Sequence, residues 1–400
     1  MDTHIASTRK KALLLGGGAP NSTLIAGALT AFLDEGVEFD VISTSGAGAL
    51  MGLLYLAPLS GSPREALARW AQIGVSDAIY EIFPVNYKVF MKPGLAAGAY
   101  RDALAAFPFT RTFFDSFAGM AGGGAAAGMW ADWLRLMLAT MSPSDLAPGS
   151  LGLCAHLPFV EQAVDFDALQ AARADFYINA YNLTQSRMTT WGKDEITPTH
   201  VRAALSFPFI YAPTEIDGDD YIEGAALDAM NFKPLVSDDE GAPGLHREID
   251  TLVVFDILGD DKLLRKPRNL YDAWVRSIIT PLVKIAKSDL RLFELEHNVD
   301  PVTGLPKRRL LKVDLTGGIA PDHWPEVLDW SDSNMKRLFD IGYYAGRRFC
   351  DEHREALMGE RGAEPAVARS PARARRAAGE RPIAQPVPAA TACDAACGAG

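Results

Sequence analysis

The sequence lacks the charge balance and the cysteine pattern that mark several large classes of protein. Its 400 residues hold 39 Lys and Arg against 50 Asp and Glu, a formal net charge of -11. Such a chain offers no basic face to a nucleic-acid backbone, so we expect no nucleic-acid partner. Its four cysteines (Cys154, Cys350, Cys393 and Cys397) follow neither disulfide nor zinc-site spacing, which indicates a reducing compartment. A metal site at the last two is disfavoured because they lie in a low-complexity end.

The first residues also lack the features of an export signal. Residues 1–10 have no basic start and no apolar run, and the apolar run at 13–15 is too short for a signal core. We therefore interpret residues 1–10 as an N-terminal tail without a signal peptide and expect a cytoplasmic protein. Peripheral contact with a membrane stays open at this stage.

What the sequence does contain is a regular alternation of strands and helices. Strands are predicted over 11–15 and 37–44, with a helix over 23–35 between them and another over 50–57. This β-α-β-α order predicts an α/β fold with a mainly parallel central sheet flanked by helices. The same domain is expected to extend over residues 11–355, with later strands near 174–183, 186–190, 251–258 and 308–315, a strand and turn over 221–226, and long helices over 269–296 and 333–353.

Residues 78–153 differ in composition from the rest of the chain because aromatic residues, Met, Gly and Ala dominate them. We interpret them as a helical insertion that forms an apolar cap or lid, either buried or in contact with a lipid surface. A membrane-spanning helix over 117–141 is the alternative, but Asp132 and Arg135 interrupt it. Residues 360–400, rich in Ala, Pro and Arg, are predicted to form a disordered tail.

Ser45 lies among small residues where the second predicted strand passes into a helix. A sharp turn of this kind can hold a nucleophile at the end of a sheet, with the N-terminus of the next helix favouring negative charge there. An ordinary loop of small residues is the alternative. If Ser45 is a nucleophile it needs a base, and none of the seven histidines has a triad-like setting. Glu223, at the end of a predicted strand and followed by Gly224, is the candidate base.

The glycine run Gly16, Gly17 and Gly18 follows the first predicted strand and precedes a helix. Such a loop can aim backbone N–H groups at an oxyanion. A nucleotide site is the alternative, but the spaced glycine fingerprint and a phosphate-binding Gly-Lys-Ser/Thr are both missing. Both glycine-rich turns are expected at the same edge of the sheet.

Taken in order, three motifs resemble those of the patatin-like phospholipases over roughly residues 11–350. They are the glycine loop at 16–22, the turn at 43–47, and the acidic motif at 223–225 with Asn231 and Pro234 after it. The resemblance implies a three-layer patatin-like fold and a Ser-acidic dyad formed by Ser45 and Glu223. It also implies an oxyanion hole drawn from Gly16, Gly17, Gly18 and Gly46, with no metal or cofactor.

The same motifs depart from the family pattern at several positions. Ser43 and Ala47 stand where the family has the outer glycines of its Gly-x-Ser-x-Gly turn, and Glu223 stands where it has Asp. Asn21 and Ser22 differ in the glycine loop as well. The longer side chain at position 223 moves the carboxylate by about one ångström, and misplacement of that size can cost about a hundredfold in rate.

From the resemblance we expect a lipid acyl hydrolase of the phospholipase A type, acting on a lipid ester such as a phospholipid, with transient contact to a membrane surface. The acyl-enzyme would form on Ser45, with Glu223 as base. Two alternatives stay open. One is a catalytically weak or inactive lipid-binding member of the fold, and the other is an esterase for a storage polyester.

Overall fold

The computed structural model describes residues 10–18, 22–72, 160–208, 211–236, 246–255, 270–317, 319 and 331–358. In this part of the chain, eight strands form one sheet with the order β5-β6-β3-β2-β1-β7-β8, and β4 also pairs with β3. The strands are β1 (Lys10–Leu15), β2 (Val41–Thr44), β3 (Asp175–Asn182), β4 (Arg187–Gly192), β5 (Thr214–Ile216), β6 (Asp219–Glu223), β7 (Ile249–Phe255) and β8 (Arg309–Lys312).

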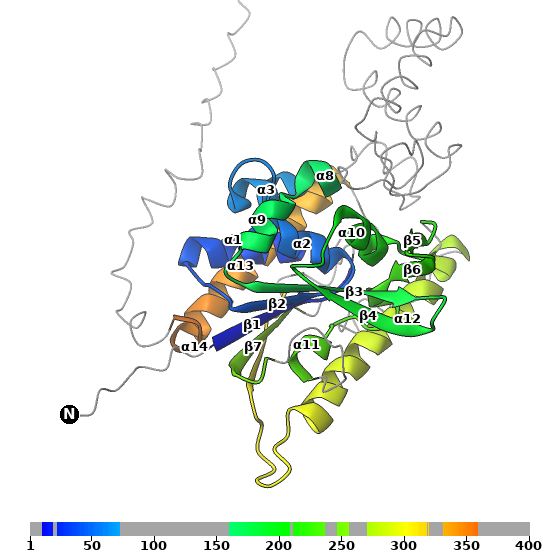
Figure 1. The fold of residues 1–400 in the computed structure, drawn as a ribbon. Coiled ribbons are helices and arrows are strands. Elements are labelled where there is room, and N and C mark those ends of the chain that lie inside the picture. Colours follow the sequence, from blue (N-terminus) through cyan, green and yellow to red (C-terminus); the bar gives the residue numbers. More distant parts are fainter. Residues whose placement is uncertain are drawn as a thin grey trace, which may run out of the picture.

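Helices cover both faces of this sheet (Figure 1). On one face lie α1 (Ser22–Glu35), α2 (Ala47–Leu56), α3 (Pro63–Trp70), α9 (Phe166–Ala171) and α13 (Asp332–Glu352), and on the other α11 (Lys233–Val236) and α12 (Leu270–Leu292). The shorter elements are α8 (Val160–Ala163), α10 (Pro198–Leu205), the 3-10 turn η1 (Gly224–Ala226), the π-helical turn η3 (Phe293–His297) and α14 (Arg354–Met358).

The two faces of the sheet bury separate apolar cores because successive side chains of a strand point to opposite faces. In β1, Leu13 and Leu15 pack with the core under α1 and α2, while Ala12 and Leu14 pack with Phe293 on the α12 side. The inner strands β1, β2 and β7 are parallel, and burial on both faces explains the apolar runs at residues 12–15 in β1 and 252–255 in β7.

The pairing along β3 fixes the position of the site. β2 runs parallel to β3 and stops at Thr44, which is opposite Ile178. β6 runs antiparallel to β3 and ends at Glu223, which is opposite Ala180. The ends of β2 and β6 therefore approach each other along one strand, with Asn179 between them, although the two strands are far apart in sequence.

The structure confirms the α/β class, the mainly parallel sheet and the elements of the first 57 residues, with two differences in their bounds. The helix predicted over 50–57 is α2 (Ala47–Leu56), which begins three residues earlier. The second strand starts at Val41 rather than Val37, since the N–H of Val37 donates to Phe32 and the Asp40 carboxylate accepts from the N–H of Lys11. Five elements were not predicted: β5, α8, α9, α11 and α14. The predicted cap or lid (78–153) and the disordered tail (360–400) lie outside the described residues.

Candidate functional site

The glycine loop and the turn after β2 meet at the carboxyl edge of the sheet, as their strand ends predict. Leu15 and Thr44 are paired in the parallel ladder, and the N–H of Ser45 donates to the Leu15 carbonyl at 3.0 Å. Glu223 ends β6 beside them. The three segments that the sequence singles out therefore lie together in the structure.

Gly46 makes the sharp change of direction between β2 and α2. Its backbone angles are φ 51° and ψ -132°, in the left-handed half of conformational space where a residue with a Cβ is strained. A Cβ placed on Gly46 would lie 2.0 Å from Oε1 of Glu223 and 2.9 Å from the Cβ of Ala225. The Glu223 carboxyl thus fills the space that a side chain at position 46 would need.

Ser45 is fully buried and its hydroxyl faces a different group of residues. Its Oγ lies 2.8 Å from Oδ1 of Asn179 and 2.7 Å from the carbonyl oxygen of Asp228. Ser43, two residues earlier on the same face, donates to the carbonyl of Asn231 at 2.7 Å. In this arrangement Ser45 is satisfied by β3 and by the segment after η1, and no hydrogen bond joins it to Glu223.

Glu223 is 8% exposed, and none of the described residues forms a hydrogen bond or ion pair with its carboxyl group. Burial penalises the charged form and raises the pKa of this carboxyl to about 8. Near pH 7 the group is therefore mostly protonated, and it can donate a hydrogen bond as well as accept one.

The predicted oxyanion loop lies against the acidic motif. A Cβ on Gly17 would lie 2.6 Å from the Cβ of Ala225 and 3.7 Å from Oε1 of Glu223. The N–H of Gly16 donates to the carbonyl of Phe255 in β7 at 3.2 Å, so this donor is already used in a hydrogen bond to the neighbouring strand. This leaves the N–H groups of Gly17, Gly18 and Gly46 as the predicted oxyanion donors.

Sequence reasoning missed Asn179 and Asp228. The Asn179 side chain contacts Ser45 and also donates to the carbonyl of Asp228 at 3.2 Å. The Asp228 carboxylate accepts the N–H groups of Met230 (3.3 Å) and Asn231 (2.9 Å), while burial raises its pKa. A fully buried Asn within the otherwise apolar run of β3 was the available signal, because buried polar groups need partners.

Asn231 was quoted only as part of the acidic motif, and the structure gives it a structural role. Its Nδ2 donates to the carbonyl of Thr44 at 3.1 Å, and its Oδ1 accepts from the Thr190 hydroxyl at 3.3 Å. Its φ is 46°, in the left-handed region that Asn tolerates better than most residues. Asn231 therefore holds the end of β2 against the segment that follows Glu223.

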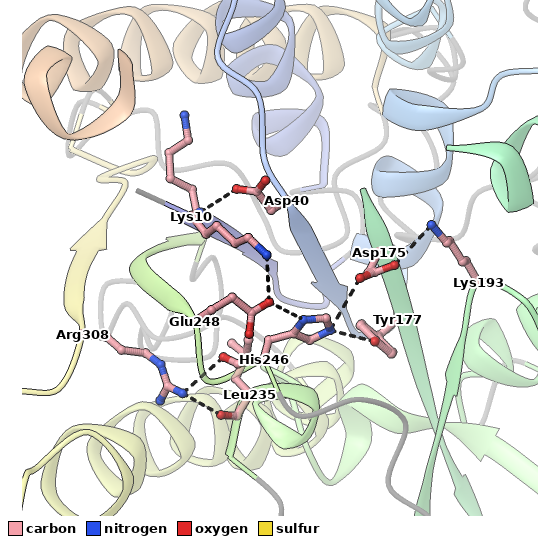
Figure 2. Close-up of polar contacts among 10 residues, drawn as sticks. Lys10, Asp40, Asp175, Tyr177, Lys193, Leu235, His246, Glu248 and Arg308 are labelled. Carbon is pink, nitrogen blue, oxygen red and sulfur yellow. Dashed lines mark hydrogen bonds and ion pairs between the residues drawn. The ribbon is translucent and has the colours of Figure 1, made fainter. Parts of the chain in front are cut away.

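A second polar cluster lies at the amino edge of the sheet, where Figure 2 shows Lys10, Glu248, His246 and Tyr177 in a continuous chain of contacts. The Tyr177 hydroxyl is 2.8 Å from Nε2 of His246, and Nδ1 of His246 is 3.4 Å from Glu248, which pairs with Lys10 at 3.3 Å. Burial raises the pKa of Tyr177 to about 12, so its hydroxyl stays neutral. This cluster links the beginnings of β1, β3 and β7, and its tyrosine is not activated as a nucleophile.

The described residues offer neither a metal site nor a membrane-spanning helix. Nowhere in these ranges do three or more His, Cys, Asp or Glu side chains group closely enough to hold a metal ion. No helix there combines the length and the apolar character that crossing a membrane requires.

Comparison with known proteins gives one family. The model of the patatin-like phospholipase family matches residues 13–236, more than half of the chain and all three motifs of the site. Among curated proteins, none matches this chain. Among solved structures, the crystal structure of VipD from Legionella pneumophila is similar, with 13% identity and a TM-score of 0.32 over 86% of this chain and 67% of that one. At this TM-score the likeness supports no statement about activity.

Proposed function

This chain belongs to the patatin-like phospholipase family of lipid hydrolases, and we propose that it binds lipid acyl esters at the candidate site without cleaving them through Ser45. One observation carries the proposal. The Ser45 hydroxyl is fully buried on Asn179 and Asp228, while the carboxyl of Glu223 is directed at Gly46. The nucleophile and the base expected from the sequence are thus not in contact.

The groups around Gly46 suit an acyl carbonyl or carboxylate. The loop at Gly17 and Gly18 and the N-terminus of α2 offer backbone N–H groups, and the helix dipole adds partial positive charge. A protonated Glu223 supplies one more donor. The lipid part of the ligand is inferred from the family, and contact with a membrane surface belongs to the same proposal.

Hydrolysis through Ser45 and Glu223 is the second candidate. The carboxyl pKa of about 8 favours it, because a base works best when its pKa is near the working pH. Ser45 Oγ would leave Asn179, pass its proton to Glu223 and bond to the ester carbon, and the alcohol would then leave with that proton. Water would release the acid in a second step with Glu223 again as base.

Fluorophosphonate labelling and ester hydrolysis separate the two candidates. Purified full-length protein is compared with S45A and with S43A, the matched control that loses a buried serine hydroxyl on the same face. We expect all three to hydrolyse a chromogenic acyl ester equally slowly and to bind fatty acid or phospholipid vesicles. Labelling of Ser45, or loss of hydrolysis in S45A alone, would establish the second candidate instead.

If hydrolysis is found, a substrate panel decides the ester class. Phospholipid vesicles, soluble short-chain esters and a storage polyester are compared under the same conditions. A preference for vesicles supports a phospholipase of the A type, and a preference for the polymer supports the depolymerase alternative.

A further inference from the structure

We infer that residue 46, not residue 45, is the position from which this turn presents a side chain to the site, and that Gly46 and the length of Glu223 together prevent acyl-enzyme formation. The inference rests on the proposed function and explains how the chain would bind a lipid ester without cleaving it. It is carried by three features of the turn: the direction of each side chain, the backbone of Gly46, and the packing of Gly48.

The direction of the side chains follows from the strand. Ser43 in β2 and Ser45, one residue past the end of β2, point the same way because residues two apart in an extended chain do, and both hydroxyls bond to the segment at 228–231. Gly46, the next residue, starts the turn, and a side chain there would point away from the segment at 228–231. A Cβ at position 46 would point at Oε1 of Glu223 and at Ala225, beside the glycine loop.

The backbone of the turn gives the same answer. The strained strand-to-helix conformation that exposes a nucleophile falls on Gly46 (φ 51°, ψ -132°), immediately before the ten-residue helix α2. Ser45 is not among the described residues with positive φ. A side chain at position 46 would therefore stand where the N-terminus of α2 and the glycine loop converge.

Gly48 fixes the register of the motif. A Cβ on Gly48 would lie 2.3 Å from the carbonyl oxygen of Leu15, so the close approach of α2 to β1 admits only glycine there. A turn centred on position 46 thus keeps its second outer glycine, at 48. A turn centred on Ser45 loses both outer glycines, to Ser43 and Ala47. The motif is better described as residues 44–48 with glycine at its centre.

The length of Glu223 places its carboxyl in the space that a side chain at position 46 would need. Oε1 lies 2.0 Å from the Cβ position of residue 46, which is shorter than any non-bonded contact, so the carboxyl occupies the volume of the missing side chain. An aspartate is one methylene shorter and would withdraw from that volume. In a turn centred on position 46, glycine replaces the family's serine just as glutamate replaces its aspartate at position 223. These two departures belong together, because Gly46 leaves the space that the Glu223 carboxyl fills.

The double substitution G46S/E223D tests this inference in the full-length chain. We expect wild type, E223D and A47S/E223D to remain at background with a fluorophosphonate probe, and G46S/E223D to be labelled at position 46 in most molecules. In the labelling step the new serine oxygen bonds to phosphorus, fluoride leaves, and the hydroxyl proton passes to the shortened carboxyl. S45A added to G46S/E223D should keep the label.

Two failures can be told apart. Labelling of Ser45 in the wild type would overturn the proposed function. A folded G46S/E223D that stays unlabelled, also with A225G added to relieve the 2.9 Å contact to Ala225, would overturn the inference.

A stability cycle covers the case in which a serine at position 46 prevents folding. We expect G46A to lower Tm strongly in the wild type and clearly less in the E223A background, because the alanine methyl group collides with the Glu223 carboxyl. An equal loss in both backgrounds, or failure of both variants to fold, would overturn the placement of Glu223 against position 46.

Discussion

At the scale of single residues, Glu223 is the most informative group in the protein. A buried carboxyl is costly to ionise when it has no partner, and Glu223 has none among the described residues at the edge of the sheet where three motifs meet. The raised pKa follows from burial, so it carries a consequence for stability as well as for chemistry.

Glu223 should make the protein less stable as pH rises. Its pKa is about 8 in the folded state against 4.5 ordinarily, so between these values the folded state holds a proton that the unfolded state releases. The resulting loss of stability is at most about 1.4 kcal/mol per pH unit. E223Q has no carboxyl to titrate at this position. The Tm of E223Q minus the Tm of the wild type should therefore increase between pH 5 and pH 8.

Thermal unfolding at several pH values measures this effect, and E355Q, at an exposed carboxyl in α14, is the control. A constant Tm difference between E223Q and the wild type across that range would contradict the raised pKa. The same measurement on E223D shows whether the shorter side chain leaves the buried position.

At the scale of elements, α1 and α13 pack closely against each other. A Cβ on Gly342 would lie 2.0 Å from the carbonyl oxygen of Leu24, and one on Gly27 would lie 2.0 Å from that of Phe339. Glycines on both helices thus let the two backbones touch. Because α1 follows the glycine loop directly, this contact also supports the position of the candidate site.

G342A should destabilise the protein by about 1–3 kcal/mol, since an added methyl group must push two backbones apart. Chemical denaturation of G342A against Y344A, whose side chain in the same helix is 71% exposed, provides the measurement and its control. A loss in G342A no larger than that in Y344A would show that the two helices separate without cost.

At the scale of the whole molecule, Arg308 connects parts that are distant in sequence. Its guanidinium donates to the carbonyl of Leu235 at 3.0 Å and to that of His246 at 3.4 Å, so it links the start of β8 to α11 and to the segment before β7 (Figure 2). Burial lowers its pKa, but the group stays charged at neutral pH.

R308M should cost about 1–3 kcal/mol in the free energy of unfolding, because two buried carbonyl groups lose their donor. R173M is the control, since Arg173 and Glu38 form an exposed pair whose side chains are 85% and 79% accessible, and such pairs contribute little. Chemical denaturation of both variants gives the comparison. Equal losses would mean that the Arg308 contacts contribute no more than a surface ion pair.

Much of this fold could be predicted from local sequence. The apolar run of β1, the glycines after it and the helix period of α1 and α13 each predict their element without reference to the rest of the chain. The meeting of the glycine loop with the turn after β2 also followed, because parallel neighbours end at one edge. β5 could not be predicted because its three residues are too few to show the alternation of apolar and polar side chains that marks a strand.

The α/β class, the three motifs and their order follow from residue types and their spacing along the chain, without any knowledge of tertiary contacts. The direction of each side chain at the turn depends instead on packing between distant parts of the chain. Ser45 faces Asn179 and Asp228 because β3 and the segment after η1 pack there, and Glu223 reaches Gly46 because β6 ends where β2 stops along β3. Contacts of this kind join residues more than a hundred positions apart, so they cannot be predicted from the residues next to Ser45 in the sequence.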